Sequence, residues 1–197
     1  MIFDYLRRLW DSIFNPSSES VQSNGIENNY SLYPVYLPEN LMRKTQELLR
    51  SFSNGEEECE GLVYWAGFKD GNGGVVTTLI VPDAKATPGS VETTAVENAK
   101  IVKLLNTNGL VLLGQAHSHP PGSGNHHSQG DDMLTFSPFE GHISIVAANY
   151  ARPQEKILET WGVHRFYNGR FKKIDHALSK KHLRIIPPVV NRRMKQN

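Results

Sequence analysis

The chain has 197 residues, which suits one globular domain with short additions at its ends. Hydrophobic residues make up 39% and charged residues 21%, as in an ordinary soluble fold, and a net charge of +1 gives no field that draws the molecule to nucleic acid or membrane. The single cysteine, Cys59, excludes an internal disulfide framework and a zinc site built from several cysteines. No apolar run approaches the roughly 18–20 residues of a membrane span, and charged residues interrupt the N-terminus, so we expect a cytoplasmic protein.

The first 31 residues are predicted to lie outside the main domain. Apolar residues recur at helical spacing over residues 2–14, which predicts a short N-terminal amphipathic helix. Residues 15–31 are rich in Ser and Asn and lack periodicity, as in a polar linker. We expect the helix to dock on its own domain or on a partner rather than on a membrane surface, because its acidic and basic residues balance.

Residues 32–175 are predicted to form one domain of mixed helices and strands. Helices are expected at 38–52, 92–106 and 129–136, and strands at 61–68, 75–81, 110–116, 142–149 and 160–167. The run at 110–116 is almost continuously apolar, which is typical of a central strand buried on both faces. This order of elements predicts an α/β or α+β sandwich with helices packed on a sheet.

Residues 176–197 are rich in lysine and arginine and are predicted to be a basic C-terminal tail. Such a tail can contact phosphate groups, but no aromatic residues interleave with the charges beyond Phe171. We therefore interpret it as a solvated, flexible terminus and expect no specific nucleic-acid partner.

The most informative stretch is 115–120, which contains the sequence His-Ser-His-Pro. Side chains two positions apart on a strand point the same way, so His117 and His119 can present two imidazoles to one point. A catalytic zinc ion needs a third protein ligand, with its fourth position left to water. The pair therefore predicts half of a metal site at the end of a buried strand.

A carboxylate follows at the start of the next helix. Ser128 and Asp131 form a Ser-x-x-Asp pattern, which places Asp131 on the first helical turn. The same pattern is typical of a helix capping box, and Ser128 can cap the helix whatever else it does. His126 and His127 resemble further ligands, but adjacent side chains in a Gly-rich loop diverge, so we interpret them as loop residues.

Together these patterns resemble the JAMM signature of MPN-plus metalloproteases. The likeness consists of the His-Ser-His-Pro run from His117, the Ser-x-x-Asp run from Ser128, and a Glu-x-x-Gly-Leu pattern that begins at Glu58. It covers roughly residues 32–171 and implies the family's fold, a deaminase-like α/β/α sandwich with a mixed central sheet. The family usually has ten residues between the second histidine and the aspartate, whereas eleven stand here, at 120–130.

The resemblance implies a role for each matching residue. His117, His119 and Asp131 would hold one zinc ion per chain, and Ser128 would donate a hydrogen bond to the oxyanion. Glu58 would take a proton from the attacking water and return one to the leaving lysine amine.

Two of these assignments rest on family spacing alone. Glu60 shares the face of Glu58 in an extended segment, so only the Glu-x-x-Gly match selects Glu58. Asp132 lies close to Asp131 around the helix, so only the Ser-x-x-Asp spacing selects Asp131. Ser118, between the two histidines, is interpreted as structural.

The resemblance predicts a zinc-dependent isopeptidase that cleaves the C-terminus of a ubiquitin-like protein from its target, or processes the precursor of that protein. It further implies a bacterial ubiquitin-like conjugation system, a class of systems to which antiviral defence operons belong. Its partners would be the ubiquitin-like protein or its conjugate and the activating and conjugating enzymes of that system. The alternative is a non-catalytic MPN scaffold, which the complete ligand set disfavours. A zinc nucleobase deaminase is excluded because that chemistry uses a Pro-Cys-x-x-Cys motif.

Overall fold

The computed structural model describes residues 33–53, 55–136, 138–153 and 157–188, so the helix and linker predicted over 2–14 and 15–31 lie outside the described residues. Its main sheet has eight strands in the order β10-β1-β3-β2-β6-β7-β8-β9. These strands are β1 (Val35–Pro38), β2 (Leu62–Asp70), β3 (Gly73–Ile80), β6 (Val111–Ser118), β7 (Ile143–Ala147), β8 (Gly162–Tyr167), β9 (Arg170–Lys173) and β10 (Leu183–Ile186).

The sheet is mixed. Strand β1 runs parallel to both β10 and β3, and β6 runs parallel to β7, whereas the other neighbours are antiparallel. Strand β6 lies in the middle of the sheet, and seven of its eight residues are buried. The apolar run at 110–116 therefore predicted the central strand correctly.

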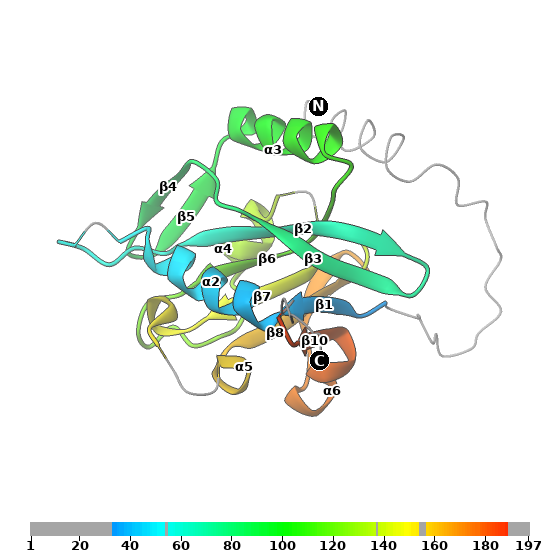
Figure 1. Ribbon diagram of the computed structural model, residues 1–197. Coiled ribbons are helices and arrows are strands. Elements are labelled where there is room, and N and C mark those ends of the chain that lie inside the picture. The colour runs from blue at the N-terminus through cyan, green and yellow to red at the C-terminus, as the bar shows by residue number, and fades with distance from the viewer. Residues whose placement is uncertain (1–32, 54, 137, 154–156, 189–197) are drawn as a thin grey trace, which may run out of the picture. The chain divides into compact units, whose positions relative to one another are not determined.

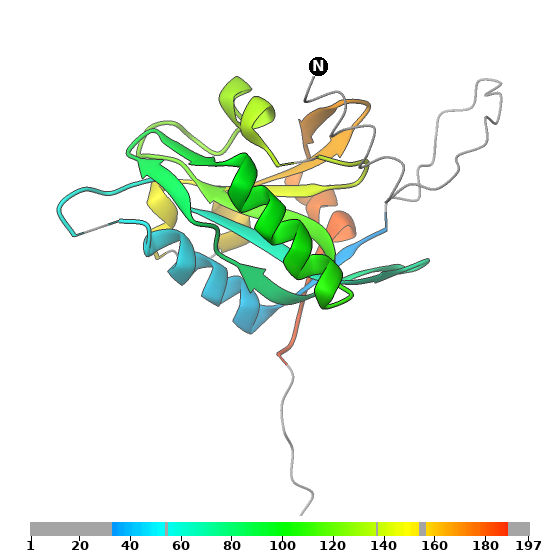
Figure 2. The same cartoon turned by 90° about the horizontal axis from the view of Figure 1, so that it is seen from above.

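Helices cover both faces of the sheet. Helix α2 (Glu39–Arg50) packs on one face and α3 (Ala95–Thr107) on the other (Figures 1 and 2). The alternation of β2 shows the two faces directly, since Val63 and Trp65 belong to the core beneath α2, whereas Leu62 and Tyr64 belong to the core beneath α3. The expected α/β/α sandwich with a mixed central sheet is confirmed.

Three shorter helices and one short turn complete the described elements. They are α4 (Gln129–Leu134), α5 (Ile157–Thr160), α6 (His176–His182) and the 3-10 turn η1 (Asn149–Ala151). Helix α4 follows the loop that leaves the central strand β6, so it begins beside the end of that strand (Figure 1).

A small second sheet was not predicted from the sequence. Strands β4 (Ala84–Thr87) and β5 (Ser90–Thr93) pair as an antiparallel hairpin that precedes α3. Both strands are short and half-buried, so they lack the long apolar alternation by which a strand is recognised. The hairpin matters for function because residues near its turn lie beside the candidate site.

The predicted boundary between domain and basic tail at residue 175 is wrong. Residues 176–182 form α6, and β10 adds a strand to the main sheet beside β1. Leu183 is buried in the core beneath α2, because the lysine- and arginine-rich segment also carries apolar residues at alternate positions. Residues 176–186 of this basic segment therefore belong to the domain and not to a tail.

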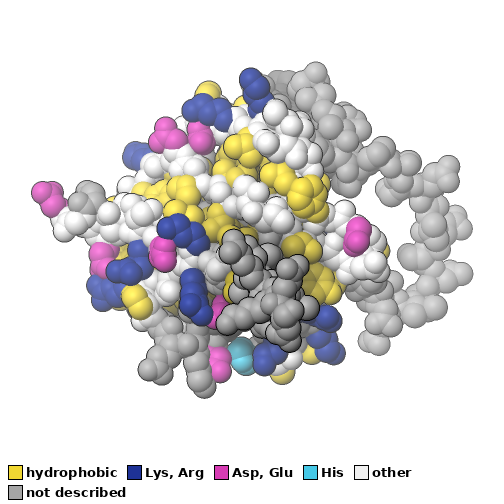
Figure 3. Space-filling view, in the orientation of Figure 1, with side chains coloured by type: hydrophobic (Ala, Val, Ile, Leu, Met, Phe, Trp, Pro, Cys, Tyr) yellow, Lys and Arg dark blue, Asp and Glu magenta, His cyan; other side chains and the backbone are white. Residues whose placement is uncertain are grey.

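Two apolar side chains are exposed where β2 ends and β3 begins. Phe68 and Val75 pair across β2 and β3, and they are 58% and 40% exposed. On the face in Figure 3, apolar side chains lie among lysine, arginine and acidic side chains. Among the described residues, no helix has both the length and the apolar character needed to cross a membrane.

A completely buried histidine makes the fold sensitive to acid. His142 is 0% exposed, contacts the rings of Phe139 and Phe171, and has no hydrogen-bond partner for either ring nitrogen among the described residues. Burial, together with the Arg165 cation, lowers the pKa of His142 to about 3. In the unfolded chain this histidine takes up a proton below about pH 6.5, whereas in the folded chain it stays neutral down to about pH 3. The free energy of unfolding is therefore highest above pH 6.5 and decreases as the pH falls below that value.

Replacing His142 with Phe should therefore flatten the acid side of the stability curve. Between pH 7.5 and pH 5 the parent should lose about 2 kcal/mol more unfolding free energy than His142→Phe, as measured by chemical denaturation. His176→Phe, at an exposed position, should keep the parental pH dependence. Equal pH dependence of His142→Phe and the parent would contradict this account.

Candidate metal centre

The central strand delivers the two predicted histidines to one side of the sheet. His117 and His119 are 3% and 4% exposed, and their ring centroids lie 5.1 Å apart. His119 is held just beyond β6, since its N–H donates to the Ala147 carbonyl and its own carbonyl accepts from the Tyr150 N–H. Pairing within the sheet holds the backbone of His117, and these two bonds hold the backbone of His119.

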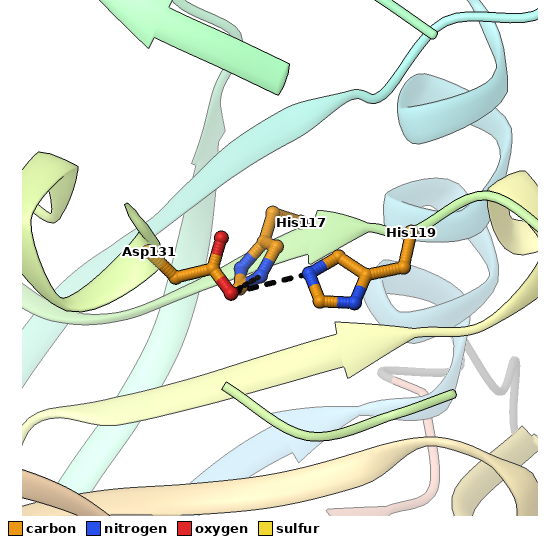
Figure 4. A group of neighbouring side chains, drawn as sticks. All are labelled: His117, His119 and Asp131. Atoms are coloured by element: carbon orange, nitrogen blue, oxygen red, sulfur yellow. Dashed lines mark hydrogen bonds and ion pairs between the residues drawn. The ribbon is translucent and has the colours of Figure 1, made fainter. Parts of the chain in front are cut away.

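Helix α4 brings a carboxylate to the same point. The Oδ2 atom of Asp131 lies 3.2 Å from His119 Nε2 and 3.4 Å from His117 Nε2 (Figure 4). Ser128 caps the helix, because its hydroxyl accepts the Asp131 N–H while its own N–H donates to Asp131 Oδ2. The capping box predicted as one interpretation of Ser-x-x-Asp is present, and it orients the carboxylate towards the histidines.

The environment favours the ionised form of this carboxylate. Burial alone would raise the pKa of Asp131, but the neighbouring imidazoles of His117 and His119 and the Ser128 N–H hold it well below its usual range. Despite this proximity, His117 Nε2 is buried and makes no hydrogen bond among the described residues. A buried nitrogen without a hydrogen bond, aimed at an anionic oxygen, is the arrangement expected where a cation completes the group.

The donor set also fits a metal ion by its dimensions. One ligand atom from each of His117, His119 and Asp131 lies within 4.8 Å of the others. Around a tetrahedral zinc ion with ligand bonds of about 2.0–2.1 Å, ligand atoms are about 3.3 Å apart. The two separations from Asp131 Oδ2, 3.2 and 3.4 Å, match this spacing.

Strand register brings Glu60 to this site. Leu62 faces His117 across the antiparallel β2–β6 pair, so two residues further on Glu60 comes opposite His119. Ser118 extends the pairing, since its hydroxyl accepts the Gly61 N–H and its own N–H donates to the Gly61 carbonyl. The structural role expected for Ser118 is confirmed.

Gly61 is required at this position by close packing. A Cβ atom there would lie 2.2 Å from the Leu49 carbonyl oxygen at the end of α2. The glycine of the Glu-x-x-Gly pattern thus permits close contact of helix and strand, and it lets the chain turn Glu60 inward.

Glu60 is buried, and the pKa of its carboxyl group lies near neutral pH. It is 5% exposed, and burial raises its pKa to about 7, the nearby His119 opposing the shift and Asp131 adding to it. Together with the two histidines and Asp131, Glu60 lines a cavity of about 450 Å³. A carboxylate with a pKa near the working pH is suited to proton transfer.

Glu58 does not join this group. Its side chain is 42% exposed and forms an ion pair with Arg152, in which the Arg152 Nε donates to Glu58 Oε1 at 3.0 Å. Glu58 is also absent from the described lining of the cavity. The structure therefore brings Glu60, not the residue selected by Glu-x-x-Gly spacing, to the predicted metal ligands.

Ser128 lies at the site as predicted. It lines the cavity, and its hydroxyl oxygen accepts the helix-capping bond, which leaves the hydroxyl proton able to donate. Gly89, Ser90 and Val91, at the turn and start of β5, line the same cavity. The unpredicted hairpin thus forms one wall of the candidate site.

The loop between the strand and α4 is more ordered than its glycine content indicated. Asn125 anchors it, since its amide donates to the Thr160 carbonyl and its Oδ1 accepts from Lys173. The side chains of His126 and His127 diverge as expected, and His126 lines the cavity. His127, however, turns inward, where its side chain is 4% exposed and its pKa is lowered to about 3 by burial and by His117.

Comparison with known proteins is consistent with this site. No family model matches the sequence. "Probable metalloprotease y4jG" of Sinorhizobium fredii (strain NBRC 101917 / NGR234) is 30% identical over 122 residues, which span 60% of this chain and 73% of that protein. The likeness to this relative indicates a metalloprotease-like enzyme. Since the chain is 30% identical to this relative and covers 73% of it, the chain belongs to the same family of probable metalloproteases.

A solved structure shares the fold of this chain. The solution structure of protein DSY2949 from Desulfitobacterium hafniense aligns with a TM-score of 0.58 at 18% identity, over 79% of this chain and 94% of that one. The crystal structure of AF2198, a JAB1/MPN domain protein from Archaeoglobus fulgidus, aligns with a TM-score of 0.41 at 16% identity, over 76% and 97%. The first likeness extends over nearly all of the described domain.

Proposed function

We propose that the protein is a zinc-dependent isopeptidase or peptidase that releases a ubiquitin-like C-terminus from its target or precursor. The observation that carries the proposal is the convergence of two buried histidines and an ionised aspartate beside a buried glutamate, in one cavity. A metalloprotease in the same family supports hydrolysis as the reaction.

His117, His119 and Asp131 would hold the zinc ion. When bound, zinc acts as a Lewis acid and lowers the pKa of coordinated water towards about 7. The imidazoles act as neutral nitrogen ligands and the carboxylate as an anionic one, so the set leaves a net positive centre that polarises a carbonyl.

Glu60 is the residue we assign as general base. Its burial and its raised pKa favour accepting a proton from water and later giving one to the leaving amine. Ser128 is assigned to donate its hydroxyl hydrogen bond to the carbonyl oxygen as that oxygen gains negative charge. The Glu60 N–H donates to the Thr87 carbonyl on β4, and the Ser128 hydroxyl accepts the Asp131 N–H within the cap of α4, so both residues are held by hydrogen bonds.

The shape of the site supports an extended, small-residue substrate. The cavity is lined by glycines at 89, 122 and 130, and its wall includes Leu62 and Val91. A lining with several glycines leaves room for a backbone to lie close, which suits the glycine-rich C-terminus of a ubiquitin-like protein. The activating and conjugating enzymes of a bacterial ubiquitin-like system are the partners we propose, and we place the reaction in the cytoplasm.

Cleavage of defined fusions tests this function. The purified protein, with its zinc content measured, is incubated with linear fusions of several bacterial ubiquitin-like proteins to a reporter. We expect cleavage after the terminal glycine that stops with a chelator and returns with zinc. Mass spectrometry of the products identifies the bond that is broken.

Each other outcome has a distinct meaning. Cleavage of unrelated peptides at the same rate would make the protein a general metallopeptidase. Zinc-loaded protein that cleaves nothing across the panel would favour the non-catalytic scaffold. Protein without zinc, prepared without chelator, would contradict the metal centre itself.

A further inference from the structure

We propose that His127 and Asp132 are positioning residues that hold α4, and thereby Asp131, against the sheet at the metal centre. This inference rests on the proposed function, because it assigns support for the same site. It concerns a hydrogen-bonded chain that links α4 to the middle of the sheet through Ser144 on β7.

The chain is continuous from the helix to the sheet. Asp132 Oδ1 lies 2.8 Å from His127 Nδ1, and His127 Nε2 lies 2.8 Å from the hydroxyl of Ser144. Gln115, on β6, donates from Nε2 to Ser144 at 3.3 Å and to the hydroxyl of Thr135 at 3.2 Å. Two neighbouring strands are thereby connected to α4 at Asp132, inside the helix, and at Thr135, its C-cap.

The chemistry of the carboxylate fixes the direction of every bond. An ionised Asp132 only accepts, so Nδ1 of the neutral His127 carries the proton and its Nε2 accepts from Ser144. The Ser144 oxygen is then left to accept from Gln115. At the other end the Thr135 hydroxyl donates to the Asp131 carbonyl at 2.6 Å, so its oxygen also accepts from Gln115.

Three of the residues that form these hydrogen bonds have buried side chains, so breaking a bond there costs free energy. Ser144 is 0% exposed, Gln115 is 3% exposed, and the His127 side chain is 4% exposed. The His127 ring stacks on Phe171 at 4.3 Å, which restricts its rotation. A buried donor or acceptor left unsatisfied costs about 1–3 kcal/mol, so loss of one link displaces its neighbours rather than leaving them in place.

Helix α4 needs such support because it is short. It has six residues, whereas isolated helices shorter than about 12–15 residues are marginal in water. The Ser128 cap orients its first turn, but the cap belongs to the same helix as Asp131. Only links to other elements, such as the one through His127, fix that turn relative to His117 and His119.

The same arrangement excludes a second catalytic site. Aspartate, histidine and serine stand in the order of a hydrolase triad, but the Ser144 hydroxyl is completely buried and cannot reach a substrate. The chain therefore supports the metal ligands and supplies no nucleophile.

Zinc affinity and the histidine tautomer test the proposal. Zinc dissociation constants are measured by competition with a chromophoric chelator for the parent, Asp132→Ala, Asp132→Asn and His127→Phe. We expect about 10- to 100-fold weaker binding for Asp132→Ala and His127→Phe, as for other residues that orient metal ligands. Asp132→Asn, whose Oδ1 still accepts from Nδ1–H, should bind more tightly than Asp132→Ala.

A control and a spectroscopic readout separate positioning from general damage. Asp83→Ala removes a carboxylate at an exposed position and should leave zinc affinity unchanged. In the metal-free parent, nitrogen NMR shifts should show the Nδ1–H tautomer of His127, and Asp132→Ala should lose this preference. Asp132 is partly exposed, so its substitution tests the proposal even if His127→Phe fails to fold.

The outcomes distinguish this inference from the proposed function. Parental zinc affinity in Asp132→Ala, with a folded protein, would overturn the positioning role while leaving the metal centre intact. A parent that binds no zinc would overturn the proposed function and this inference with it. An Nε2–H tautomer in the parent would overturn the assigned hydrogen-bond directions.

Discussion

His119→Ala should abolish both zinc binding and hydrolysis. The imidazole is one of only three protein ligands that we assign to the metal, and it also contributes the hydrogen bond to Asp131 Oδ2 at 3.2 Å. Two remaining ligands do not retain zinc against dilution, so elemental analysis after gel filtration should find essentially no metal. Without metal, cleavage of the fusion substrate should fall below detection.

A matched histidine substitution controls for this result. His176→Ala removes an exposed imidazole at the start of α6, so its zinc content and rate should equal those of the parent. His117→Ala should behave like His119→Ala. An enzyme that keeps one zinc per chain after loss of His119 would show that the metal lies elsewhere.

The candidate metal-binding group could be predicted from the sequence because its geometry is local. His117 and His119 follow the period of one strand, and Asp131 follows the cap of the next helix. The strand end and the helix start are joined by a single loop, so a short stretch of sequence contains the ligand group. The central strand and the sandwich were predictable for the same reason, since they follow from apolar periodicity.

The remaining features depend on partners far apart in the chain. Glu58 and Glu60 are two positions apart, so their side chains share one face of an extended segment. Only the β2–β6 register, with Leu62 opposite His117, distinguishes them. His127 lies in a loop as predicted, but its inward orientation could not be predicted, because its partner Ser144 lies on β7, 17 residues away. Strand β10 was missed because its partner β1 lies at the opposite end of the domain sequence, and the basic residues around it are the more prominent feature of its segment.

Glu60→Gln should retain the fold and one zinc ion but lose cleavage activity. Glutamine preserves the size of the side chain and removes the carboxylate that accepts a proton. Loss of a general base typically lowers the rate on the order of a hundredfold or more. Glu60 is not among the three metal ligands, so zinc content measured by elemental analysis should stay near one per chain.

Glu58→Gln is the matched control, because it makes the same chemical change two residues away. Glu58 is exposed and paired with Arg152, so we expect a rate close to that of the parent, measured as kcat with the fusion substrate. Exposed ion pairs contribute little to stability, so loss of this one leaves the protein folded. If Glu58→Gln were inactive and Glu60→Gln active, the base would be the residue selected by the Glu-x-x-Gly spacing. The segment before β2 would then have to turn Glu58 inward during the reaction, breaking its ion pair with Arg152.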